Sequence, residues 1–308
     1  AERRLDAGRT LLHNPPVNPD KWHRMLSGSR RWAVCAIAVA VLLAPGLHHH
    51  ADAGDAHQDC YVCGQRVRDA MSGWQMNTRG LQTDSKHPTG SVKIEIIDGE
   101  PHYTILEHRA YDHIDRARLP AIGSASVLYH GTLALRNRPS REALEGLRNG
   151  LDAMVLLDVN LRDPWWRKED VLASTEASDW VKLNEDELKL LGGDDGNDHR
   201  SRAQRFLQNH DLAGLVVTLG EKGAFACTAQ GGFAEVEPAG LAEVVDTVGA
   251  GDAFTSVLIL GLSREWPLDL TLQRAQDFAA RVVAQRGATI HEREVYRDML
   301  RDWSVRTT

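Results

Sequence analysis

The chain has 308 residues, of which 42% are hydrophobic and 26% charged, and these fractions exclude a disordered chain. Its 36 Lys and Arg against 43 Asp and Glu give a formal net charge of -7, which argues against a nucleic-acid surface built on phosphate neutralisation. The length suits one large α/β domain or two small ones, and the charge suits a protein that handles small molecules without establishing it.

Residues 32–44 form an unbroken apolar run. The run is too short for a membrane-spanning helix, which needs about 20 residues, so we expect no membrane association. It has the length of the apolar centre of a secretory signal starting at Met25, but 24 residues precede that methionine. The alternatives are a buried helix or strand, or a stretch that is not native to the fold.

Cys60 and Cys63 form the pattern C-x-x-C, which is typical of half a zinc site or of a redox pair. His57 and the histidines at 48–50 lie nearby in the sequence, but their spacing matches no standard zinc finger. We therefore favour incidental thiols in a reducing compartment over a metal or redox site.

From residue 64 onward, helical and strand patterns alternate. Residues 65–74 predict a short helix, and residues 90–106 predict a hairpin around the turn Asp98-Gly99. Apolar runs predict buried strands at 126–129, 154–158, 179–183 and 215–219. Helices are predicted at 141–149, 185–191, 250–262 and 272–286. This alternation predicts an α/β fold with a mostly parallel sheet and helices on both of its faces.

The most distinctive local feature is a glycine-rich acidic turn, Asp246-Thr247-Val248-Gly249-Ala250-Gly251-Asp252, followed by an apolar helical run. Small residues let backbone N–H groups converge on an anion at a helix N-terminus. Asp252 would repel a bound phosphate, but it suits a general base beside a phosphoryl group in transfer. The alternative interpretation is an N-cap aspartate after a glycine turn.

The glycine-rich turn fits D-T-x-G-A-G-D-x-F, and three further motifs precede it. They are Asp158-Val159-Asn160-Leu161-Arg162 with Trp165-Trp166 after it, Asn184 to Glu187 as N-x-x-E, and Val217 to Ala224 as T-x-G-x-x-G. Over roughly residues 64–288, the chain resembles the ribokinase-like, phosphofructokinase-B type carbohydrate kinases, fructokinase-like bacterial members in particular. The resemblance implies a ribokinase-like α/β fold with a small β lid, and transfer of the γ-phosphate of ATP to a sugar hydroxyl.

The resemblance also implies site residues. Asp252 would be the catalytic base, and the anion hole would come from Gly249, Ala250 and Gly251. The nucleotide would lie along Thr218, Gly220, Gly223, Thr247, Ala279, Ala280 and Gly287.

The pair Asn184 and Glu187 would order Mg²⁺ and its waters near the phosphates. The same pair could instead form a capping box at a helix start, with no metal. Arg162 and Asn160 would contact substrate or phosphate. Their alternatives are a surface ion pair for Arg162 and a strand-end hydrogen bond for Asn160.

The chain departs from the family before Gly64. Members begin with a strand whose Asp holds sugar hydroxyls, followed by a Gly-Gly loop and an Asn, and residues 1–63 contain no such pattern. A shifted reading frame, a wrong start or a degraded homologue would each produce this junction. We therefore expect an atypical segment at 1–63 and a kinase domain at 64–308 whose activity is impaired. The alternative is a non-catalytic, nucleotide-binding relic of a sugar kinase.

The resemblance further implies ATP and Mg²⁺ as cofactors and a small sugar as substrate. A monovalent cation such as K⁺ and a homodimer through the lid are compatible with it. It also implies a cytoplasmic location, without nucleic-acid or membrane partners.

Overall fold

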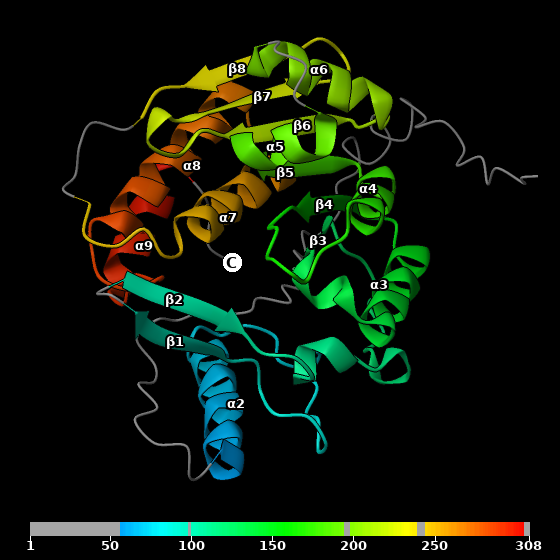
Figure 1. Ribbon diagram of the computed structural model, residues 1–308. Coiled ribbons are helices and arrows are strands. Elements are labelled where there is room, and N and C mark those ends of the chain that lie inside the picture. Colours follow the sequence, from blue (N-terminus) through cyan, green and yellow to red (C-terminus); the bar gives the residue numbers. More distant parts are fainter. Residues whose placement is uncertain (1–55, 98–99, 194–197, 239–243, 305–308) are drawn as a thin grey trace, which may run out of the picture. The chain divides into compact units, whose positions relative to one another are not determined.

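The structure is a computed structural model that describes residues 56–97, 100–193, 198–238 and 244–304 (Figure 1). The apolar run 32–44 and Met25 lie outside the described residues. The first described element is helix α2 (Ala56–Gly73), which includes all but the last residue of the predicted helix 65–74 and carries Cys60 and Cys63. No helix within the described ranges is long and apolar enough to cross a membrane.

The predicted hairpin is present as strands β1 (Val92–Ile97) and β2 (Glu100–Ile105). The two strands pair antiparallel, with Val92 opposite Ile105 and Ile97 opposite Glu100, and they form a sheet of their own. The second strand begins at Glu100, directly after the predicted turn. The turn Asp98-Gly99 lies outside the described residues.

The main sheet has six strands in the order β3-β4-β5-β6-β7-β8. The first four are mutually parallel: β3 (Val127–Gly131), β4 (Met154–Asp158), β5 (Trp180–Asn184) and β6 (Gly214–Thr218). The last two are antiparallel additions at one edge: β7 (Ala224–Thr228) and β8 (Phe233–Val236). The mostly parallel sheet is thus confirmed, and the antiparallel edge was not predicted.

Seven further helices connect or cover the strands in the described part of the chain. They are α3 (Arg138–Gly150), α4 (Lys168–Glu176), α5 (Glu185–Gly192), α6 (His199–Asn209), α7 (Ala250–Ser263), α8 (Leu268–Val283) and α9 (Arg293–Asp302). Helix α3 begins three residues before the prediction because Pro139 fits the first helical turn, where its missing N–H is not needed. Helix α8 begins directly after Pro267, one turn before the predicted start.

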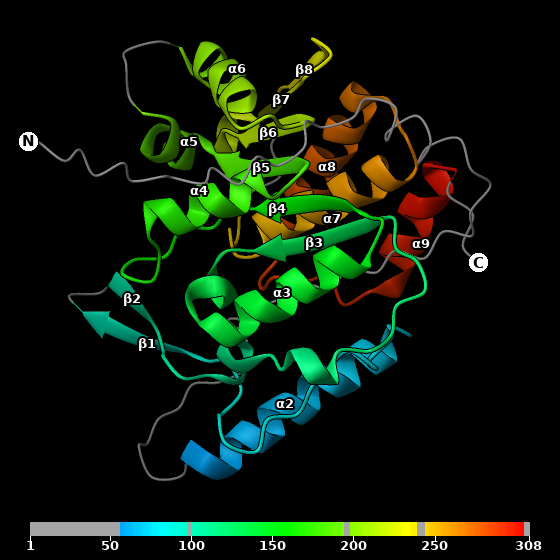
Figure 2. The ribbon, with the colours of Figure 1, turned by 90° about the vertical axis from the view of Figure 1, so that its right-hand side faces the viewer.

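Helices cover both faces of the main sheet, as predicted (Figure 2). Alternate residues of a strand point to opposite faces. On β4, Leu157 packs in a buried cluster with side chains of α4, α5 and α6, and Val155 packs in a cluster with α3. Asp158 points to the opposite face and contacts α7. The fold therefore places a charged side chain of a buried strand directly under helix α7.

Candidate active site

The predicted site residues gather at the carboxyl ends of three neighbouring strands. Asn160 and Arg162 follow β4, Asn184 ends β5, and Thr218 ends β6. In the strand register Asn184 lies opposite Thr218. Ligands of open α/β sheets bind outside the carboxyl ends of the strands, so these residues occupy the edge where a ligand is expected.

The glycine-rich turn forms the start of α7, with Gly249 as its N-cap residue at φ 83°. A Cβ atom at this position would lie 2.6 Å from both the Cα and the carbonyl oxygen of Ala288, so only glycine fits. Ala250, Gly251 and Asp252 make the first turn of the helix. The alternative interpretation of Asp252 as the N-cap is therefore wrong, because Gly249 holds that position.

The Asp246 carboxylate ties the glycine-rich turn to the segment after α8. Its Oδ1 accepts a hydrogen bond from the Val248 N–H at 3.0 Å, and its Oδ2 accepts one from the Gly287 N–H at 3.0 Å. The Val283 carbonyl at the end of α8 accepts from the N–H groups of Val245 and Asp246. The predicted nucleotide residues of this region thus lie on connected segments: Thr247, Ala279, Ala280 and Gly287.

The turn between β6 and β7 contains Gly220 at φ 62° and Gly223 at φ 94°. The Leu219 N–H donates to the Gly223 carbonyl at 2.8 Å and closes the turn. A Cβ atom on Gly223 would lie 2.1 Å from the Val236 carbonyl oxygen of β8. Packing against β8 thus suffices to require glycine at position 223, with or without a nucleotide.

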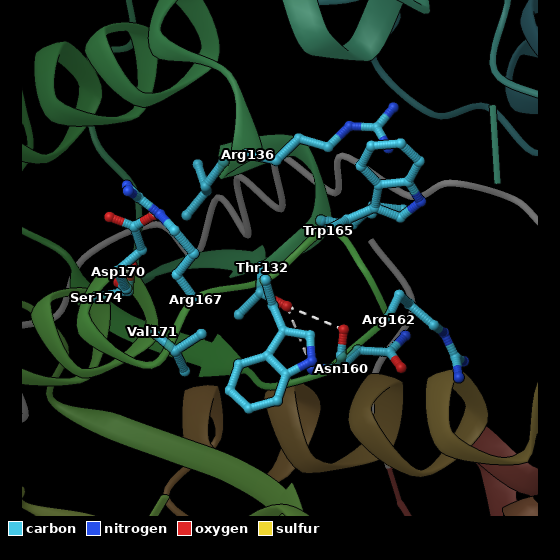
Figure 3. A pocket seen from close by; sticks show the side chains of 12 residues that line it. Thr132, Arg136, Asn160, Arg162, Trp165, Arg167, Asp170, Val171 and Ser174 are labelled. Atoms are coloured by element: carbon cyan, nitrogen blue, oxygen red, sulfur yellow. Dashed lines mark hydrogen bonds and ion pairs between the residues drawn. The ribbon is translucent and has the colours of Figure 1, made fainter. Parts of the chain in front are cut away.

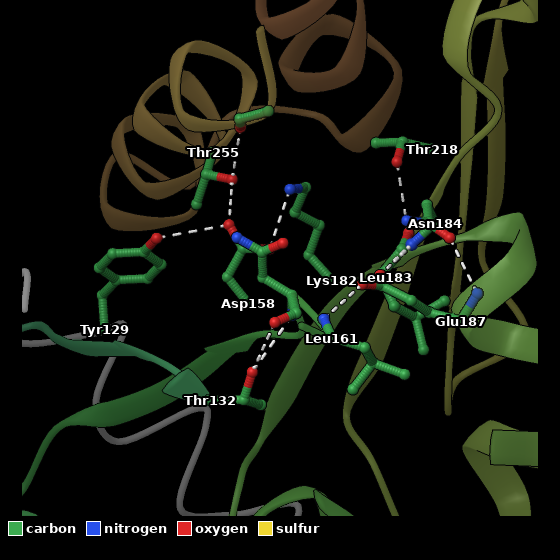
Figure 4. A network of polar contacts seen from close by, with 12 residues as sticks. Tyr129, Thr132, Asp158, Leu161, Lys182, Leu183, Asn184, Glu187, Thr218 and Thr255 are labelled. Carbon is green, nitrogen blue, oxygen red and sulfur yellow. Dashed lines mark hydrogen bonds and ion pairs between the residues drawn. The ribbon is translucent and has the colours of Figure 1, made fainter. Parts of the chain in front are cut away.

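A buried polar network lies between the sheet and α7 (Figure 4). The Lys182 ammonium of β5 pairs with Asp158 Oδ1 of β4 at 2.9 Å. The Thr255 hydroxyl of α7 donates to Asp158 Oδ2 at 2.7 Å, and the Tyr129 hydroxyl of β3 donates to the same oxygen at 3.3 Å. One carboxylate therefore connects three strands or helices besides its own.

Asp252 stands beside this network. Burial of its carboxyl and the nearby Asp158 carboxylate raise its pKa, and the Lys182 and Arg162 cations act in the opposite direction. The Asp252 residue as a whole is exposed to solvent, which weakens the effect of burial on the pKa of its carboxyl. A carboxylate with a raised pKa accepts a proton more readily, as a general base requires.

Asn184 and Glu187 form the complete capping box of α5. The Glu187 N–H donates to Asn184 Oδ1 at 2.8 Å, and the Asn184 N–H donates to Glu187 Oε2 at 2.9 Å. The Leu161 N–H donates to Glu187 Oε1 at 2.9 Å. Burial raises the pKa of the Glu187 carboxyl, although the hydrogen bonds from the Asn184 and Leu161 N–H groups oppose the rise.

Carboxylate and amide oxygens are the donors that Mg²⁺ prefers, and Mg²⁺ usually keeps several of its waters. Both Glu187 oxygens already accept a backbone N–H. Among the residues that the structure describes, no group of three or more His, Cys, Asp and Glu side chains could hold a metal ion. The pair therefore fits Mg²⁺ through bound water rather than by direct ligation.

Asn160 and Arg162 line a pocket between the loop after β4, helix α4 and the turn after β3 (Figure 3). The Thr132 hydroxyl donates to the Asn160 carbonyl at 3.0 Å and joins two walls of the pocket. Trp165 contributes to the lining and stacks under the Arg136 guanidinium at 4.7 Å. Asn160 and Arg162 line this pocket, whereas Asp252 does not.

Sequence reasoning assigned no role to Lys182, Thr255 or Asp246. Lys182 could have been identified as a candidate site residue, because a charged residue between Val181 and Leu183 interrupts an otherwise apolar strand. Its partner Asp158 entered the sequence analysis only as the first residue of the motif that contains Asn160 and Arg162. The strand register that makes them neighbours could not be read from the sequence.

Residues 62–294 match the family model described as pfkB family carbohydrate kinase. The chain is 36% identical over 176 residues to aminoimidazole riboside kinase of Salmonella typhimurium, a match that covers 54% of each chain. It is 31% identical over 195 residues to a fructokinase of Escherichia coli, covering 59% of this chain and 62% of that protein. The chain thus spans between half and two thirds of the length of these curated relatives.

Among solved structures, the chain is similar to aminoimidazole riboside kinase from Salmonella enterica complexed with aminoimidazole riboside and an ATP analog. The TM-score is 0.61 at 28% identity, and the match covers 73% of this chain and 76% of that chain. These comparisons confirm the family and the ribokinase-like fold predicted from the four sequence motifs.

Proposed function

Because the chain belongs to the pfkB family of carbohydrate kinases, we propose that it transfers the γ-phosphoryl group of ATP to a hydroxyl of a small sugar or sugar-like alcohol. The observation that carries the proposal is the position of Asp252 in the first turn of α7, directly after Gly249, Ala250 and Gly251. This arrangement combines a proton acceptor with a helix N-terminus that favours anions.

In this reaction, Asp252 accepts the proton of the substrate hydroxyl while the hydroxyl oxygen attacks the γ-phosphorus. The bond from the γ-phosphorus to the bridging oxygen breaks, and ADP leaves. The N–H groups of the first turn of α7, from Gly249 to Gly251, stabilise the negative charge on the transferring group. The raised pKa of Asp252 favours its part as the base.

The nucleotide would lie along the turn after β6, with Thr218, Gly220 and Gly223, and along Thr247, Ala279, Ala280 and Gly287. Bound Mg²⁺ would neutralise charge on the phosphates, and Asn184 and Glu187 would hold its waters. The ATP analog in the similar kinase structure supports ATP as the phosphoryl donor. A K⁺ requirement and a homodimer through the hairpin β1–β2 remain predictions.

Arg162 and Asn160 would contact the substrate or the transferring phosphate from the loop after β4. Fructose and aminoimidazole riboside are the first substrates to test, because the similar proteins are named for them. Since the reaction consumes ATP, we propose a cytoplasmic location.

The direct test is a coupled ADP-release assay over a panel of sugars, ribosides and sugar alcohols, with ATP–Mg²⁺ binding measured in parallel. We expect turnover with one class of substrate, at an efficiency reduced by the atypical residues 1–63. ATP–Mg²⁺ binding without turnover on any alcohol would contradict the proposal and favour the nucleotide-binding relic.

A further inference from the structure

The buried ion pair under α7 contacts no reacting group in the mechanism above. Asp158 and Lys182 are register partners on adjacent strands, and their side chains are 8% and 9% exposed. Removing two charges from water is costly, and apolar residues of similar size often stabilise a fold equally well. The position of this pair beside Asp252 therefore points to a role in the site rather than in stability alone.

Thr255 connects the ion pair to the helix that carries Asp252. Its hydroxyl oxygen lies 2.7 Å from Asp158 Oδ2 and 2.8 Å from the carbonyl oxygen of Gly251. A hydroxyl has a single hydrogen, and a bond to a carboxylate is stronger than one to a neutral carbonyl. The bond to Asp158 therefore holds the first two turns of α7 against β4.

Lys182 also lies against the first turn of α7. A Cβ atom built on Gly251 would lie 3.5 Å from the Lys182 ammonium nitrogen. The buried cation thus lies directly beneath the residue that precedes Asp252, where the proposed anion hole is formed.

We propose that Asp158 is a positioning residue for Asp252: through Thr255 and Lys182 it holds the first turn of α7 in place and sets the charge environment of the base. This inference rests on the proposed kinase function. The charged and titratable groups that face Asp252 are Asp158 of β4, Lys182 of β5, Arg162 after β4 and Tyr129 of β3. Asp158 favours the protonated form of Asp252, and the two cations favour the ionised form.

The positioning part is tested with Thr255→Val, which removes the hydroxyl and keeps the shape. We expect kcat to fall on the order of 10-fold with an unchanged KM for ATP, because misplacement of a reacting group is expensive. Thr255→Ser should restore kcat. The matched control is Thr175→Val in α4, because the Thr175 hydroxyl is equally buried but donates to the carbonyl four residues earlier instead of to a carboxylate.

The electrostatic part is tested with Asp158→Asn. Turnover requires ionised Asp252, so removing the neighbouring negative charge should move the acid limb of the kcat–pH profile to lower pH, by about one unit. Because the single variant leaves Lys182 without its partner, the double variant Asp158→Asn/Lys182→Met is measured beside it. The shift should be smaller in the double variant, since the two lost charges act in opposite directions.

A carbon-13 NMR titration of the Asp252 carboxyl, assigned with Asp252→Asn, gives a readout that needs no turnover. If the wild-type chain phosphorylates nothing, but the Asp252 titration moves to lower pH in Asp158→Asn, the proposed function fails and only the electrostatic part of the inference stands. Wild-type kcat in Thr255→Val, or an unmoved Asp252 titration in Asp158→Asn, overturns the inference.

Discussion

Glu187 accepts a hydrogen bond from the Leu161 backbone N–H at 2.9 Å, and this bond joins the first turn of α5 to the loop after β4. The same carboxylate closes the capping box with Asn184. Glu187 therefore fixes the loop that carries Asn160 and Arg162 as well as its own helix, and its position depends on both contacts.

This double role gives a prediction for Glu187→Gln. The substitution removes the negative charge and one acceptor oxygen, so it should lower the free energy of unfolding by about 0.5–2 kcal/mol. If Glu187 also orders the waters of Mg²⁺, the Mg²⁺ concentration for half-maximal rate should rise. A lower melting temperature with an unchanged Mg²⁺ titration would leave Glu187 with the capping role alone.

A second prediction concerns the glycine at the start of α7. Alanine at a left-handed backbone position costs about 1–2 kcal/mol, and at Gly249 its Cβ would also meet the backbone of Ala288. Gly249→Ala should therefore lower the free energy of unfolding by about 1–3 kcal/mol more than the left-handed conformation alone would. Gly231→Ala is the matched control, since Gly231 has φ 82° and open space around it. Equal unfolding free energies for the two variants in urea would contradict this account.

A third prediction concerns His130, which is buried on β3. Burial lowers the pKa of His130 to about 4, against 6.5 for an unperturbed histidine. As the pH falls, His130 therefore takes up a proton in the unfolded chain before it does so in the folded protein. The free energy of unfolding should decrease by roughly 2–3 kcal/mol between about pH 6.5 and pH 4.

The measurement compares urea unfolding of wild type and His130→Leu at pH 7 and pH 4.5. The variant should lose less stability between the two pH values, by about 2 kcal/mol. His291→Leu, at a solvent-exposed position, serves as the control and should follow wild type. The same pH dependence in His130→Leu and wild type would refute the prediction.

Local patterns predicted the fold where one stretch of sequence determines an element. Strand β4 was predicted residue for residue because its apolar run ends at Asp158. Strand β7 was not predicted, since Ala224-Phe225-Ala226-Cys227-Thr228 has no polar alternation and few β-branched residues. Helix α6 was also missed, because its sequence His199–Asn209 is rich in arginine and its apolar stripe is short.

The site, like the fold, has parts that a local sequence pattern predicts and parts that it does not. The turn from Asp246 to Asp252 was recognised because its glycines and acidic residues are contiguous in the sequence. The contacts between Asp158, Lys182 and Thr255 were not predicted, because they depend on the register of β4 against β5 and on the docking of α7. Thr255 lies 97 residues after Asp158 in the chain, and no local pattern relates the two.

The central claim is that Asp252 is the base of a phosphoryl transfer to an alcohol. The most direct measurement is kcat of Asp252→Asn against wild type with the best substrate of the panel, with ATP–Mg²⁺ affinity measured by calorimetry on both proteins. The amide keeps the shape of the turn but cannot take the proton, so kcat should fall on the order of 10²–10⁴-fold while the affinity for ATP–Mg²⁺ changes little. Turnover by Asp252→Asn within a few-fold of wild type would contradict the claim.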